Sequence, residues 1–120
     1  MSPDLDRLQG TWNIVEFELE SQKLPAAGSK IIVDGSNFTT LAMGARYEGT
    51  LTLDATRRPK TFELTFTEGP EKGNTSLGIY DLTGDTWTIC LGLTGRSRPA
   101  EFATAPGSGH ALEVLKRDGC

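Results

Sequence analysis

Few side chains in this 120-residue chain are of the types that perform acid–base or metal chemistry. His110 is the single histidine, and it lies in a Gly-rich stretch that predicts a turn. A zinc or haem site built from protein ligands would need further histidines or clustered cysteines, which the sequence lacks. We therefore expect an exposed turn histidine, no metal and no cofactor. A haem held by His110 stays an alternative only if that residue lies on a strand or loop lining a cavity.

Two pairs of carboxylates could exchange protons with a substrate. Glu16 and Glu18 share a face of a predicted strand, and Asp81 and Asp85 flank a predicted turn. In a small protein of net charge −4, a solvated acidic face is the simpler interpretation. Ser108 lies between two glycines but lacks the strand–elbow–helix context of a nucleophile. The sequence therefore predicts that the protein is not an enzyme.

The elements that would position these groups are short strands joined by turns rich in glycine, proline and polar residues. The predicted strands cover residues 10–19, 31–34, 37–41, 46–53, 61–67, 76–82, 86–91 and 111–117. Residues 99–104 could add a short edge strand, since proline is tolerated there. No segment has a convincing helical period. The pattern predicts an all-β sandwich or barrel, and the tight turns favour one antiparallel up-and-down barrel of eight to ten strands over residues 1–120.

The first predicted strand supplies the expected closure of this barrel. Gly10 would let another backbone approach closely, and Trp12 would plug one end with a large apolar ring. Alternation places Ile14 on the same face as Trp12. The opposite face would carry Val15, Phe17 and Leu19.

Charge and cysteine content limit the partners and the compartment. The net charge of −4 argues against nucleic acid and against anionic membrane surfaces. No apolar run approaches the ~20 residues of a membrane helix, and the N-terminus lacks a signal-peptide pattern, so a cytoplasmic location is expected unless the chain was trimmed from a secreted precursor. We expect Cys90 to be a buried thiol and Cys120 an exposed tail thiol. A bridge between the two, and the choice between monomer and homodimer, stay open.

Short pieces spread over most of the chain form a combined pattern. They are Leu8-Gln9-Gly10-Thr11-Trp12, Lys23-Leu24-Pro25, 67–73, Gly78-Ile79-Tyr80-Asp81-Leu82, Gly84-Asp85-Thr86, Arg98-Pro99-Ala100-Glu101-Phe102, 106–109 and Leu115-Lys116-Arg117. With these pieces the chain resembles the lipocalin-like (calycin-type) small β-barrels, and more closely a family of uncharacterised bacterial lipocalin-like domains. The longer strands and disulfides of the larger lipocalins are absent, so their ligands do not transfer.

The resemblance implies roles for two basic residues. In lipocalins a basic residue of the closing strand lies across the plug tryptophan, which assigns Arg117, or else Lys116, to Trp12 through a cation–π contact of ~1 kcal/mol. Arg46, Arg96 and Arg98 could each hold a carboxylate at a barrel mouth. Arg98 is preferred because the family pattern includes it, and the alternative is a structural ion pair with a glutamate or a backbone contact.

The functional hypothesis is non-catalytic binding of a small apolar or amphipathic ligand inside the barrel. Phe62, Leu64, Tyr80, Trp87 and Phe102 would line the interior, and Arg98 would anchor an anionic head group at the rim. A barrel of this size can also be packed solid. The alternative is therefore a protein-interaction or oligomerisation module without a ligand. An enzyme on the same scaffold would need an inward-facing polar cluster with a perturbed acid or base.

Overall fold

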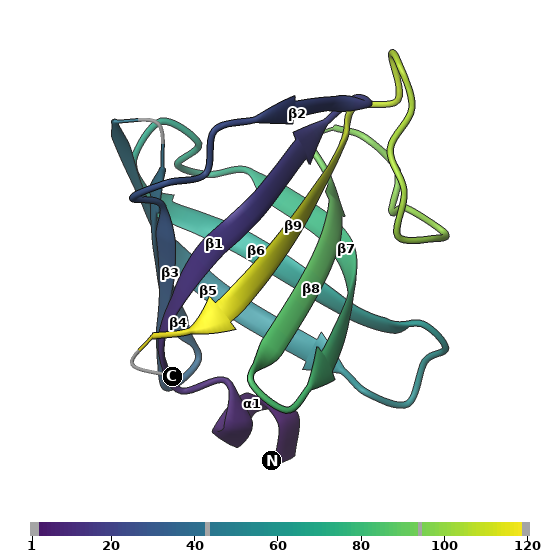
Figure 1. Ribbon diagram of the computed structural model, residues 1–120. Coiled ribbons are helices and arrows are strands. Elements are labelled where there is room, and N and C mark those ends of the chain that lie inside the picture. Colours follow the sequence, from purple (N-terminus) through teal and green to yellow (C-terminus); the bar gives the residue numbers. More distant parts are fainter. Residues whose placement is uncertain (1–2, 43, 94, 119–120) are drawn as a thin grey trace.

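The computed structural model describes residues 3–42, 44–93 and 95–118. Within these residues a short helix precedes nine strands (Figure 1). The elements are α1 (Pro3–Arg7), β1 (Gly10–Leu19), β2 (Gln22–Leu24), β3 (Lys30–Asp34), β4 (Asn37–Ala42), β5 (Ala45–Asp54), β6 (Lys60–Glu68), β7 (Thr75–Thr83), β8 (Thr86–Gly92) and β9 (His110–Arg117). None of the described helical residues forms a segment long and apolar enough to cross a membrane.

The sheet is antiparallel and closes on itself. Strands β3 to β9 pair in chain order, β1 pairs with both β3 and β9, and β2 pairs with β1 alone. Eight strands therefore form the ring and β2 is an extra strand at one end. The predicted all-β, up-and-down barrel is confirmed. Across β7 and β8, Tyr80 faces Ile89 and Leu82 faces Trp87, which confirms that Tyr80 and Trp87 share a face.

A β-bulge in β1 overturns the predicted faces of this strand. Ile14 pairs with Leu115 of β9, but Glu16 pairs with the next residue back, Val114, so Val15 has no partner. Val15 is 48% exposed. Because of the extra residue, the side chains of Trp12, Ile14, Phe17 and Leu19 all face the interior. The prediction had placed the first two and the last two on opposite faces.

Residues 99–104 do not form the suggested edge strand, which is a correction. The segment from 95 to 109 leaves the ring and lies outside the barrel (Figure 1). It covers the outer face of β8, where the Sγ of Cys90 lies 3.6 Å from the carbonyl oxygen of Ala103. Ser21 is also held to this segment, through a 2.8 Å bond from its N–H to Thr104 Oγ1. These contacts fasten the segment to β8 and to Ser21 without adding a strand to the sheet.

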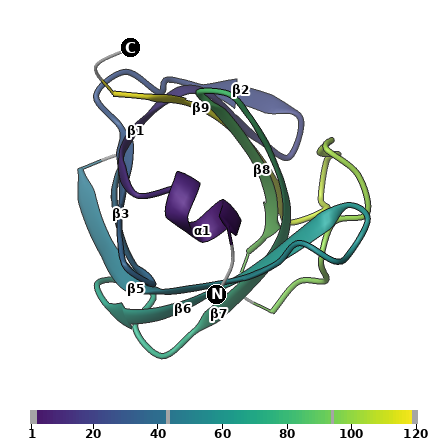
Figure 2. The same ribbon diagram turned by 90° about the horizontal axis from the view of Figure 1, so that it is seen from below.

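Helix α1 closes one end of the barrel, and it lies across the opening when the barrel is viewed along its axis (Figure 2). Leu8, directly after the helix, is fully buried, and its carbonyl oxygen accepts a 2.9 Å hydrogen bond from Trp12 Nε1. Trp12 packs edge-to-face on Trp87 with ring centroids 5.6 Å apart. This half of the interior is therefore a packed core.

Two glycines serve this packing in different ways. Gly10 has a φ of +112°, and a Cβ there would meet only Arg117 Nη1, at 3.7 Å. The expected close backbone approach at Gly10 is therefore wrong, and the left-handed conformation is its reason. Gly78 lies under the ring of Phe62, where a Cβ would stand 2.4 Å from Cζ.

Gly78→Ala is expected to lower the free energy of unfolding by about 1 to 3 kcal/mol, because the added methyl group overlaps both Phe62 and the carbonyl oxygen of Cys90. Denaturant unfolding measures the loss. Adding Phe62→Leu should recover part of it, since the shorter side chain vacates the overlap. Costs that simply add in the double variant would contradict this contact.

Candidate functional site

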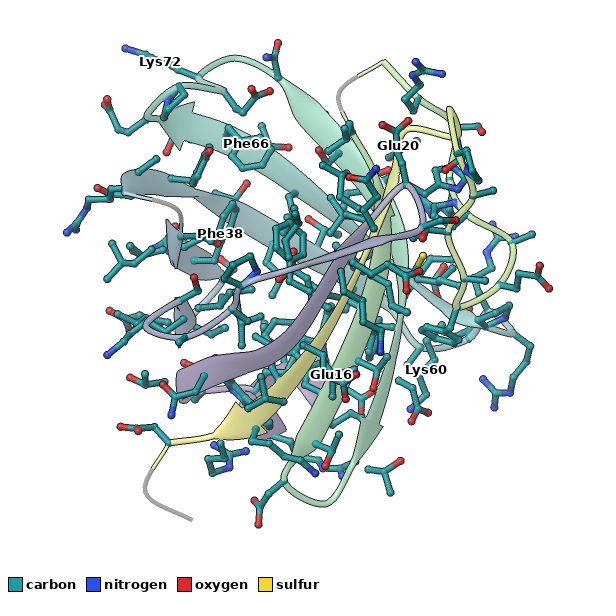
Figure 3. All side chains as sticks on the ribbon, turned by 45° about the horizontal axis from the view of Figure 1, so that its top comes forward. Glu16, Glu20, Phe38, Lys60, Phe66 and Lys72 are labelled. Atoms are coloured by element: carbon teal, nitrogen blue, oxygen red, sulfur yellow. The ribbon has the colours of Figure 1, made fainter. Side chains whose placement is uncertain are left out.

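The half of the barrel away from α1 encloses a cavity of about 470 Å³. Side chains from all eight strands of the ring line it, among them Phe17 of β1, Leu64 of β6, Ile89 of β8 and Glu113 of β9. Phe66, which is labelled in Figure 3, also lines it and packs edge-to-face on Phe38 with centroids 5.6 Å apart. The wall is mostly apolar, as expected of a ligand pocket in a barrel mouth.

The polar groups of the cavity are few and lie at different depths. Glu71, in the turn after β6, reaches the mouth, and its Oε1 accepts a 3.1 Å hydrogen bond from Asn74 Nδ2. The hydroxyl-bearing side chains of Thr40, Tyr47 and Ser76 belong to the wall. Among the described residues that line the cavity, none is a lysine, an arginine or a histidine.

Glu113 is the ionisable group at the inner end of this cavity. Its neighbours in the ladder are Phe17 on β1 and Ile89 on β8, which are both apolar. Parts of the residue keep accessible surface along the cavity, but Oε1 has essentially none and no hydrogen-bond partner among the described residues. Burial raises the pKa of the Glu113 carboxyl from 4.5 to about 7.

Glu113 was not among the residues predicted from the sequence, although a signal for it was present. Arg117 lies over Trp12, with its guanidinium carbon 4.4 Å from the ring centroid. Since Arg117 faces inward, alternation along β9 also turns Leu115, Glu113 and Ala111 inward. An acidic residue between the apolar Ala111 and Leu115 of this inward row is the feature that would have identified the site.

The residues expected to line the interior fall into three groups. Phe62, Tyr80 and Trp87 are buried in the closed half and fill it rather than facing the cavity. Leu64 lines the cavity. Phe102 does not, which is a correction: it belongs to the segment outside the barrel and is not packed against the interior cluster.

The arginines do not reach the cavity either. Arg98 lies on the outer face of the barrel, where its Nη2 is 3.8 Å from Oε1 of Glu63. The structure therefore contains the ion pair that was the alternative for Arg98, and it does not place Arg98 at the cavity. Arg46 pairs with Glu48 at 2.7 Å, also outside the cavity. The side chain of Arg96 packs beside Gly109 in the outer segment.

The remaining candidates have structural partners away from the cavity. His110 begins β9, and its Nε2 lies 3.1 Å from the carbonyl oxygen of Ser97. Ser108 Oγ accepts hydrogen bonds from the N–H groups of Ala105 and His110, at 3.3 and 3.2 Å, and so fastens a turn. Glu18 accepts a hydrogen bond from Thr104 Oγ1. Within the described residues, no three His, Cys, Asp or Glu side chains gather closely enough to hold a metal ion.

Arg117 and Asp4 hold the closed end together. The Arg117 guanidinium donates to the carbonyl oxygens of Arg7 and Gln9, the latter at 3.0 Å, and to Asp85 Oδ1 at 3.2 Å. Lys116, the other basic candidate, points away and donates to Thr86 Oγ1 at 2.6 Å. Asp4 of α1 accepts hydrogen bonds from the Tyr80 hydroxyl at 2.8 Å and from Lys60 Nζ at 3.0 Å.

The pKa values at the closed end follow from these contacts. Burial acts to raise the pKa of the Asp4 carboxyl. The hydrogen bonds from Tyr80 and Lys60 outweigh this effect and hold the pKa below its ordinary value of 3.8. Burial, together with the Asp4 carboxylate, raises the pKa of Tyr80 well above its ordinary value. Cys90 is a free, buried thiol whose pKa is raised by burial, and the expectation for Cys120 lies outside the described residues.

Compared with known proteins, the chain matches no family model, no curated protein and no solved structure. The finding common to sequence and structure is therefore the small closed antiparallel barrel itself. The features of the barrel that bear on function are its partly filled interior and Glu113.

Proposed function

We propose that this chain is a lipocalin-like barrel that binds a small apolar or amphipathic molecule without transforming it. The observation that carries the proposal is the cavity of about 470 Å³, whose lining is mainly apolar and receives side chains from every strand of the ring. Its volume lies in the range of small-molecule sites, roughly 300 to 1,000 Å³. Burying an apolar ligand there would contribute about 25 cal/mol for each Å² removed from water.

The two halves of the barrel favour different functions. The closed half, with Trp12, Trp87 and Leu8, is packed like an ordinary core and would suit the alternative of a solid interaction module. The open half has aromatic and aliphatic walls around a cavity, which a solid module does not need. The cavity therefore favours ligand binding over an interaction module.

Binding of an apolar fluorescent probe tests this proposal. We expect the wild-type protein to bind an anilinonaphthalene or a medium-chain alcohol with micromolar affinity, about −8 kcal/mol, and to change its tryptophan emission on binding. Ser76→Phe places a ring in the cavity from β7 and should weaken binding about tenfold or more. Thr75→Phe, which changes the next residue on the exposed face, is the matched control.

The outcome that contradicts the proposal is specific. A barrel that binds none of these probes, or binds them equally in the Ser76→Phe and Thr75→Phe variants, would leave the cavity without a role and would favour the interaction module. Both variants must first be shown to unfold cooperatively, so that lost binding is not lost structure.

A further inference from the structure

The cavity carries an acid and no balancing base. Glu113 supplies its inner carboxyl, and the described lining residues include no lysine, arginine or histidine. The electrostatic preference of this interior is therefore for positive charge. The sequence-based expectation of an anionic head group held by Arg98 had the opposite sign, and Arg98 is on the outside of the barrel.

The position of Glu113 within the barrel determines how deep in the cavity a positively charged ligand group would lie. Along β9 the inward residues run from Ala111, through Glu113, to Leu115, which is fully buried above the plug. Glu113 thus lies where the cavity meets the packed core. A ligand reaching it must insert its polar end first and leave its apolar body against Phe17, Leu64 and Ile89, nearer the mouth.

The unpaired oxygen indicates what that polar end must be. Oε1 of Glu113 is buried without a hydrogen-bond donor, and a buried acceptor left unpaired costs free energy. A ligand that donates a hydrogen bond to this carboxyl, once the side chain turns the oxygen toward the cavity, would recover this cost. A cationic donor would gain more than a neutral one, because charge-assisted hydrogen bonds are about twice as strong as neutral ones.

From these observations we infer that the cavity selects small apolar amines, whose ammonium group binds the Glu113 carboxylate at the inner end of the barrel. The inference rests on the proposed function and specifies the class of ligand. A carboxylate ligand would place two negative charges at one site and is expected to be rejected. A neutral alcohol would bind through its apolar body with only an ordinary hydrogen bond.

The groups facing Glu113 also determine the pH dependence of this binding. The two strands beside it present Phe17 and Ile89, which do not ionise, and the other ionisable cavity residues are Tyr47 and Glu71. Arg117 lies beyond Leu115, where it is occupied by Trp12 and by backbone carbonyl oxygens. Protonation of Glu113 is therefore the event expected to weaken amine binding as the pH falls, since a primary amine stays protonated up to about pH 10.

Isothermal titration with octylamine, octanol and octanoate tests the inference, since the three share one apolar body and differ in charge. At about pH 8 we expect octylamine to bind about tenfold more tightly than octanol, and octanoate more weakly than octanol. Glu113→Gln keeps the shape and should remove the advantage of octylamine while leaving octanol affinity within about threefold. Glu16→Gln makes the same change on the outside of the neighbouring strand and should keep the advantage.

The possible results distinguish a failure of the amine preference from a failure of ligand binding itself. Equal binding of octylamine and octanol, or an amine preference that survives Glu113→Gln, would overturn the inference while leaving ligand binding intact. Failure of all three compounds to bind would overturn both. Octylamine affinity that falls toward about pH 5.5 in the wild type, but not in Glu113→Gln, would support the role of the Glu113 carboxylate.

Discussion

Asp4→Ala is expected to lower the free energy of unfolding by about 2 to 3 kcal/mol at neutral pH. The Asp4 side chain is 9% exposed and accepts hydrogen bonds from the Tyr80 hydroxyl and from Lys60 Nζ. Its removal leaves the buried hydroxyl of Tyr80 without an acceptor and Lys60 without its ion pair. Because these contacts join α1 to β6 and β7, the loss should also loosen the plug. Denaturant unfolding measures the cost.

Asp6→Ala is the matched control for this prediction. Asp6 lies on the same short helix but is exposed, so its removal should change the free energy of unfolding by no more than about 0.5 kcal/mol. A double-mutant cycle with Tyr80→Phe should show a coupling of about 1 kcal/mol with Asp4, since the phenylalanine has no hydroxyl to leave unpaired. Equal costs for Asp4→Ala and Asp6→Ala would mean that α1 does not close the barrel.

The cost of Asp4→Ala should also depend on pH. The folded pKa of Asp4 lies below its ordinary value of 3.8, so its contribution to stability is complete above that value. It is lost as the pH falls through the folded pKa, where the carboxyl takes up a proton in both states. The curves of stability against pH for the wild type and Asp4→Ala are therefore expected to converge at acidic pH.

The strands were predictable because alternation and turn chemistry are local. The turn at Gly35 and the turn at Gly84 follow directly from the residues, since both glycines have positive φ between paired strands. The contact of Arg117 with Trp12 came from the family resemblance and is present in the structure. The bulge at Val15 was missed because alternation assumes an unbroken ladder, and one inserted residue exchanges the two faces beyond it.

The candidate site was less predictable because it depends on where a long connection goes. Phe102 and Arg98 have the chemistry of a lining and an anchor, but their sequence does not state whether 95–109 folds over the mouth or over the outer wall. The outer wall carries the paired residues Ile79 and Cys90, which are 2% and 0% exposed on the side away from the interior cluster. The segment packs there because it covers these apolar side chains. This path of the segment places Phe102 and Arg98 away from the cavity.

Glu113→Gln is expected to stabilise the protein by about 3 kcal/mol at about pH 8.5, although it removes no contact and fills no space. The folded pKa of Glu113 is about 7 against an ordinary value of 4.5, and each unit of difference corresponds to about 1.36 kcal/mol. Between these values the folded state binds more protons than the unfolded state. Stability therefore falls as the pH rises through this window, and glutamine, which does not ionise, escapes the loss.

At about pH 4 the wild type and Glu113→Gln should be equally stable, because the carboxyl is then protonated in both states. Glu16→Gln, on the exposed face of β1, is the matched control and should change the free energy of unfolding at about pH 8.5 by no more than about 0.5 kcal/mol. If the curves of stability against pH ran parallel for the wild type and Glu113→Gln, folding would not raise the pKa of Glu113. The carboxyl would then not be buried without a partner. If the curves diverge as expected, octylamine should restore the stability of the wild type above about pH 7, because its ammonium group would pair with the carboxylate that costs the fold.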